Sequence, residues 1–96
     1  MLEKIISAIN DRKEISFKYS GLSRVAQPAA VGKSLSGNII LRCYQTQGDH
    51  IEPGHQWNLC IIDKMQELNI TKTTFIENPP GYKPGDSHMC EIFAEL

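Results

Sequence analysis

Residues 37–48 read GNIILRCYQTQG and residues 57–65 read WNLCIIDKM, and these two runs decide the fold. The first predicts a strand over Ile39–Gln45, which opens on three consecutive aliphatic side chains. The second predicts a strand over Trp57–Ile62. The polar stretch Thr46–Gln56 between them contains two glycines and a proline, a composition typical of a hairpin loop longer than the tightest turns. The centre of the chain is therefore expected to be β-structure.

Towards the N-terminus, apolar side chains at 15, 17 and 19 alternate with polar ones, which predicts a half-buried strand. Ser20-Gly21 supplies a turn. A further strand is expected over Ser23–Ala30, with an edge or a bulge at Pro28 because proline cannot donate to a sheet ladder. Before these strands, apolar residues at 2, 5, 6 and 9 predict one short amphipathic helix.

Towards the C-terminus, a fifth short strand is expected to end near Thr73. The prolines and glycines between Phe75 and Asp86 exclude a regular element, so this segment is expected to form an extended strap anchored by Tyr82. Residues 89–96 then repeat helical spacing and predict a short C-terminal helix, with a strand as the alternative because the segment is brief. Short strands joined by small turns curl into a barrel, since closure removes exposed edges.

The 96 residues are enough for one domain. Ten basic and 11 acidic residues give a formal net charge of -1, whereas a non-specific DNA-binding protein usually carries a basic excess. The cysteines are odd in number and the first ten residues lack a secretory signal, so we expect no disulfide framework and a reducing, cytoplasmic location. The apolar runs are too short for a membrane span.

Five segments, in order, resemble the WYL domain, a family named for a Trp-Tyr-Leu run on one strand, and they cover nearly the whole chain. They are LEKIISAINDRKEISFKYSG (2–21), SRVAQP (23–28), GNIILRCYQTQG (37–48), WNLCIIDKM (57–65) and FIENPPGYKPGDSHM (75–89). Ile39-Ile40-Leu41 occupies the place of the name-giving run. The last segment is similar to the tail of some short, stand-alone bacterial members.

The resemblance implies a mainly β (α+β) fold, a small five-stranded Sm-like or SH3-like barrel with an N-terminal helix. Residues 1–96 would form a single WYL-like domain, of which residues 75–96 are the C-terminal strap and tail. The resemblance also implies a regulatory role, in which the domain binds a nucleotide-like ligand or nucleic acid and modulates a partner or transcription. Many members lie beside a helix-turn-helix domain. Here residues 2–9 form a lone helix, which argues against direct reading of the major groove.

The resemblance places four charged residues in one region: Arg24, Arg42, Asp63 and Lys64. Arginine suits a phosphate group because its planar fork donates paired, charge-assisted hydrogen bonds. Asp63 would orient an arginine or accept a hydrogen bond from a ribose hydroxyl or a base. The alternative is that Arg42 and Asp63 form a structural ion pair and that Lys64 is merely solvated.

Tyr44 and Trp57 are the candidate aromatic contacts, since stacking on a base is the sequence-tolerant way in which a small barrel holds a single strand. The alternative is that they belong to the core, as the lone tryptophan of a small domain often does. Gln45 and Asn58 are expected either to hydrogen-bond to the edge of a ligand or to be solvated strand residues.

No metal, cofactor or catalytic residue is expected. Three histidines and three cysteines offer six potential ligands, but none of the spacings of metal sites occurs. The cysteines are more simply small core residues. The GKS run at Gly32–Ser34 lacks the upstream glycine of a phosphate loop, since that position is Gln27, and no Gly-x-Ser-x-Gly elbow is present.

These observations leave three hypotheses for function. The leading one is a stand-alone regulatory barrel, without enzymatic activity, that binds a nucleotide-like small molecule or single-stranded nucleic acid. The alternative is a protein–protein interaction or homodimerisation module without a nucleic-acid ligand, which exposed side chains at Ile39 and Ile40 would favour. A redox or metal sensor that uses the cysteines ranks last.

Overall fold

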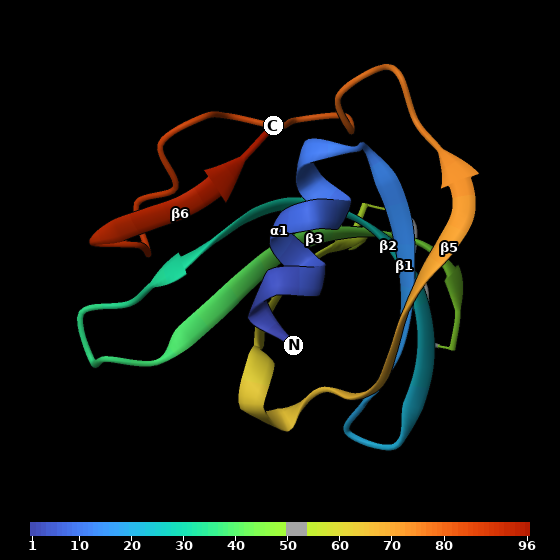
Figure 1. The fold of residues 1–96 in the computed structure, drawn as a ribbon, viewed down its shortest axis with the longest axis horizontal. Helices are drawn as coiled ribbons and strands as arrows, with labels where there is room; N and C mark the ends of the chain where they lie inside the picture. The colour runs from blue at the N-terminus through green and yellow to red at the C-terminus, as the bar shows by residue number, and fades with distance from the viewer. Residues whose placement is uncertain (50–53) are drawn as a thin grey trace.

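The computed structural model describes residues 1–49 and 54–96, and this part of the chain contains one α-helix and six strands (Figure 1). A short 3-10 helix joins β4 to β5. Positions 50–53 of the predicted Thr46–Gln56 loop, with His50, lie outside the described residues. The elements are α1 (Leu2–Asn10), β1 (Lys13–Tyr19), β2 (Leu22–Lys33), β3 (Ile39–Gly48), β4 (Trp57–Ile61), the 3-10 helix (Ile62–Lys64), β5 (Gln66–Thr74) and β6 (Glu91–Glu95).

Five strands form an open antiparallel sheet in the order β4-β3-β2-β1-β5, and β6 pairs with β2 beside this path. The prediction of a mainly β fold with an N-terminal helix is confirmed, with six strands in the described residues instead of five. Ser20 and Gly21 join β1 to β2 with φ angles of 53° and 75°, as a tight type I′ hairpin turn requires. No helix within residues 1–49 and 54–96 has the length and apolar content needed to cross a membrane.

Strand β2 is long enough to pair with two strands along one edge. Its first half pairs with β1 as far as Ala26, and its last residues, from Ala30 to Lys33, pair with β6. Its register against β3 shifts between Pro28 and Ala30, which confirms the predicted bulge. A bulge accommodates a residue that has no N–H to donate.

The prediction of a C-terminal helix over residues 89–96 is wrong, and the strand alternative holds. β1 leaves the edge of β2 at Ala26, so the backbone groups further along that edge need another partner. β6 supplies it, with Ala30 opposite Glu95 and Lys33 opposite Glu91. A segment this short gains too little as an isolated helix to compete with these ladder bonds.

The main core lies between α1 and one face of the sheet, which we call the inner face (Figure 1). Ile5 and Ile9 of α1 pack there against sheet residues such as Ile15 and Leu41, and each of these side chains is at most 2% exposed. Removal of this apolar surface from water is the main source of stability. The opposite, outer face carries a smaller cluster of Ala30, Ile40 and Met89.

Candidate functional site

Alternation along β3 and β4 sorts the predicted site residues onto two faces of the sheet. Arg42 and Tyr44 lie on the outer face, and Trp57 joins them because it is the cross-strand partner of Tyr44. Gln45 and Asn58 lie on the inner face. The Asn58 side-chain N–H donates to Oε1 of Gln45 at 3.3 Å, so these two amides bond to each other and present no edge to a ligand on the outer face.

Arg24 does not lie with Arg42. Arg24 lies on β2, where its cross-strand partner is Phe17 of β1, and its guanidinium carbon lies 5.4 Å from the centre of the Tyr19 ring. Its Nε atom is buried and has no hydrogen-bond partner in the part of the chain that the structure describes. Arg24 and Arg42 line separate pockets, so the structure does not bring the two arginines to one ligand.

Asp63 and Lys64 are exposed on the 3-10 helix between β4 and β5, and neither lines the pocket that contains Arg42. The alternative ion pair between Arg42 and Asp63 is not formed. The carboxylate that Arg42 contacts is Asp86, with 2.8 Å between Nε and Oδ2. The partner of Arg42 therefore comes from the segment between β5 and β6.

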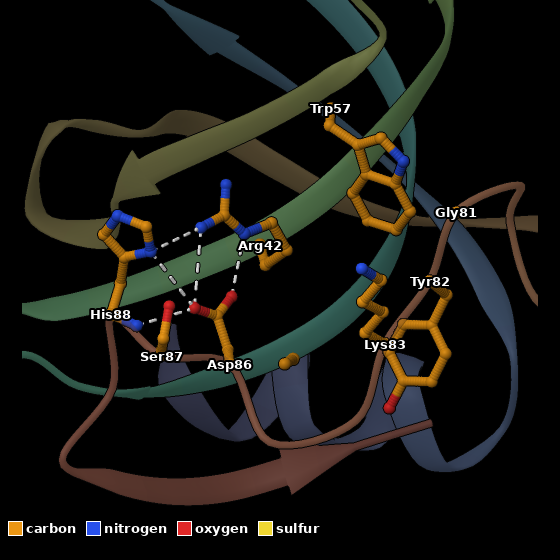
Figure 2. Close-up of a pocket in the computed structure, with 9 residues that line it drawn as sticks. Arg42, Trp57, Gly81, Tyr82, Lys83, Asp86, Ser87 and His88 are labelled. Atoms are coloured by element: carbon orange, nitrogen blue, oxygen red, sulfur yellow. Dashed lines mark hydrogen bonds and ion pairs between the residues drawn. The ribbon is translucent and has the colours of Figure 1, made fainter.

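A cavity of about 260 Å³ lies between the outer face and this segment (Figure 2). We call it the outer-face pocket. It brings together two of the predicted site residues, Arg42 and Trp57, with residues that the sequence did not assign to a site. The lining residues are Ala30, Arg42, Trp57, Gly81, Tyr82, Lys83, Asp86, Ser87 and His88.

Hydrogen bonds fix the two aromatic rings of the outer-face pocket. The Trp57 indole N–H donates to the carbonyl oxygen of Pro80 at 2.8 Å, and its ring meets the Tyr44 ring edge-on, with centres 5.4 Å apart. The Tyr82 hydroxyl donates to the carbonyl oxygen of Leu96 at 2.8 Å. Because both polar tips are satisfied by the protein, the ring faces are the parts left for a ligand.

An ion pair forms the opposite wall of the pocket (Figure 2). Arg42 donates through Nε to Asp86, and its Nη2 lies 3.0 Å from Nδ1 of His88. The His88 backbone N–H donates to Oδ1 of Asp86 at 2.9 Å, a local turn in which an aspartate bonds two residues ahead. Burial alone would raise the pKa of Asp86, but the hydrogen bonds from Arg42 and the His88 N–H outweigh it and hold the pKa below its ordinary value.

Lys83 is the remaining cation of the pocket. It is exposed, and it forms no hydrogen bond or ion pair with residues 1–49 or 54–96. Figure 2 shows its amine between the rings of Trp57 and Tyr82. The pocket thus presents aromatic faces beside an unengaged ammonium group.

Acid is expected to remove the stabilising contribution of Asp86. Its folded-state pKa lies below the unfolded value of about 3.9, so the contribution is present above roughly that pH and is lost as the pH falls through the folded-state pKa. We expect the difference in free energy of unfolding between the wild type and Asp86→Asn to shrink from about pH 6 to about pH 2. Urea denaturation at several pH values measures it, and a difference that stays constant into strong acid would contradict the assignment.

The cysteines divide between core and surface. Cys43 and Cys60 are buried, as expected, whereas Cys90 is exposed and the expectation of a core position is wrong for it. The hydrogen bond that the Cys43 thiol donates to Cys60 raises the pKa of Cys43, and burial raises it further. Among the described residues, no three His, Cys, Asp or Glu side chains are grouped as a metal ion would require.

Ile39 and Ile40 offer little surface to a protein partner. Ile40 is 4% exposed and packs in the small cluster with Ala30 and Met89 on the outer face, and Ile39 is half-buried. The feature that would have favoured a protein–protein module at this pair is therefore missing.

Sequence reasoning missed the part of the pocket that residues 81–88 contribute, apart from the anchoring role expected of Tyr82. A segment rich in proline and glycine has no periodicity from which side-chain directions can be read. The one available signal was composition, because Tyr82-Lys83 and the run Asp86-Ser87-His88 place hydrogen-bonding and charged groups in a loop, where binding residues are common.

No protein-family model, curated protein or solved structure matches this chain. The resemblance to the WYL domain therefore stays a prediction, and the outer-face pocket has to be interpreted from its own chemistry.

Proposed function

We propose that the protein is a regulatory ligand-binding module and that a nucleotide-like ligand binds in the outer-face pocket. The observation that carries the proposal is the Trp57 ring beside the ammonium group of Lys83, unengaged by any described residue, in one cavity. An aromatic face supports a base by stacking, and a cationic nitrogen supports a phosphate group through charge-assisted hydrogen bonds. The pocket thus contains the two kinds of group that a nucleotide needs.

The size of the pocket supports a ligand with a single base. Its volume of about 260 Å³ lies just under the usual range for small-molecule sites, which is roughly 300–1,000 Å³. A mononucleotide, or one residue of a single strand, matches this space better than a dinucleotide cofactor does.

We also propose that the sheet closes into a small barrel of the Sm-like type. The Tyr19 hydroxyl of β1 accepts a hydrogen bond from the backbone N–H of Ile61 in β4 at 3.0 Å, although β1 and β4 are not neighbours in the sheet. A side chain that spans two strands in this way supports a sheet curled on itself. Curvature of this kind would keep Arg42 and Trp57 in fixed positions, as a binding site requires.

The regulatory part of the proposal rests on the resemblance to the WYL domain and on the position of the pocket. Trp57 and Arg42 bind the segment between β5 and β6 through Pro80 and Asp86. A ligand in the pocket would contact both the sheet and this surface segment. Its presence would therefore change a surface that a partner protein or a transcription complex can contact.

Trp57 is the lone tryptophan of the chain, so its fluorescence reports on the pocket directly. We expect AMP, or a short single-stranded oligonucleotide, to change this fluorescence in a saturable way. Lys83→Ala should weaken AMP binding by roughly three- to fivefold, the range expected for an exposed charge. Lys72→Ala is the matched control, because Lys72 is also exposed but lies on β5, outside the pocket.

Two results would contradict the proposal. One is the absence of any saturable change with mononucleotides or single strands at low salt, where electrostatic attraction is strongest. The other is equal weakening by the Lys83 and Lys72 variants, since that would indicate attraction to the surface in general and not to this pocket.

A further inference from the structure

The guanidinium group of Arg42 is already occupied by an anion from the same chain. Nε of Arg42 lies 2.8 Å from Oδ2 of Asp86, and Nη2 lies 3.5 Å from Oδ1, so the carboxylate faces one edge of the guanidinium plane. A carboxylate on this edge has the geometry with which arginine binds either carboxylates or phosphates. Asp86 therefore occupies the place that a ligand phosphate would take on Arg42.

The two members of this pair come from different kinds of structure. Arg42 lies within β3, paired on both sides by β2 and β4, whereas Asp86 belongs to the irregular segment before β6. The backbone N–H of His88 fixes the Asp86 carboxylate, and the Asp86 side chain is only 9% exposed. The carboxylate is thus positioned by its own turn and buried against Arg42.

Because Arg42 is paired with Asp86, the outer-face pocket contains, among the residues that the structure describes, one paired cation, Arg42, and one unpaired cation, Lys83. Lys83 is free of any partner among the described residues, whereas the Nε edge of Arg42 is neutralised. A ligand phosphate that contacts Lys83 gains an exposed ion pair, which contributes little to affinity. A phosphate that reaches the Nε edge of Arg42 has first to displace a buried carboxylate, which costs much of what the new contact contributes.

We propose that Asp86 is the residue that determines how strongly the outer-face pocket discriminates for phosphate, because it acts as a built-in competitor for Arg42. This inference rests on the proposed function, since it concerns the same pocket. In the wild type, recognition comes mainly from the base and its stacking on Trp57. With Asp86 neutralised, Arg42 becomes available and recognition shifts to the phosphate group.

The experiment compares adenosine, AMP and inorganic phosphate in the wild type, Asp86→Asn and the double variant Asp86→Asn/Arg42→Gln, each followed by Trp57 fluorescence. The wild type should bind AMP and adenosine with affinities within about fivefold of each other. In Asp86→Asn, the ratio of AMP affinity to adenosine affinity should be at least tenfold higher than in the wild type. The double variant should lose this increase. Inorganic phosphate should compete with AMP in Asp86→Asn and much less in the wild type.

The outcomes separate the two proposals. If adenosine and AMP bind but the AMP preference is unchanged in Asp86→Asn, or persists in the double variant, Asp86 is not a competitor while the pocket remains a nucleotide site. If the wild type binds AMP more than tenfold more tightly than adenosine, the inference is overturned without any variant. The inference therefore stays testable even if Asp86→Asn fails to fold. If neither compound binds to any folded variant, the proposed function itself fails, and the inference fails with it.

Discussion

Replacement of Gly32 by alanine is expected to detach β6 from β2 and to lower the free energy of unfolding by about 3 kcal/mol, the upper end of the usual cost of overpacking. A Cβ atom at this position would lie 3.0 Å from both Cα of Ile92 and Sδ of Met89, and closer still to the carbonyl oxygen of Glu91. Two of these obstacles are backbone atoms of the paired segment and cannot rotate away. The strand that completes the edge of β2 therefore has to move.

Gly21→Ala serves as the control for this variant. Nothing lies within 4 Å of a Cβ at Gly21, so its cost should be only the strain of a positive φ, roughly 1–2 kcal/mol. Urea denaturation gives the stability of both variants, and amide hydrogen exchange over residues 91–95 reports on β6. Wild-type protection of β6 in a fully stable Gly32→Ala protein would show that the close packing inferred here is wrong.

The fold was predictable where local patterns decide it. The alternation of Ile15, Phe17 and Tyr19 with polar residues and the Ser20-Gly21 turn place β1 and its hairpin before any long-range contact is known. β6 differs, because its residues have helical spacing and become a strand only through the free edge of β2. That edge exists because β1 separates from β2 after Ala26, a long-range feature that periodicity does not report.

The candidate site was harder to predict because it depends on strand register. Arg24 and Arg42 were expected together, yet β2 carries an extra residue between Pro28 and Ala30 in its pairing with β3. That extra residue reverses the alternation along β2, so Arg24 lies on the inner face with Ala26, whereas Ala30, the partner of Arg42, lies on the outer face. Trp57 lies on the outer face with Arg42 because its pairing with Tyr44 depends on the regular β3–β4 ladder alone, and its stacking on a base stays a prediction.

Replacement of Leu41 by alanine is expected to lower the free energy of unfolding by about 2–5 kcal/mol, the range measured for buried leucines. Leu41 is 0% exposed, lies near the start of β3 between its partners Val31 of β2 and Cys60 of β4, and belongs to the main core. The loss would be a large part of the roughly 5–15 kcal/mol that a small domain has in total. The midpoint of urea unfolding should fall while the slope stays the same.

Leu59→Ala is the matched control, and it makes this measurement a test of the site as well as of the core. Leu59 is the cross-strand partner of Arg42, lies on the outer face and is 37% exposed, so its truncation should cost less than about 1 kcal/mol. The difference in stability loss between Leu41→Ala and Leu59→Ala depends on the alternation that places Leu41 on the inner face and Arg42 in the outer-face pocket. If the two variants lost equal stability, the face assignment of β3 would be wrong and Arg42 would not line the pocket.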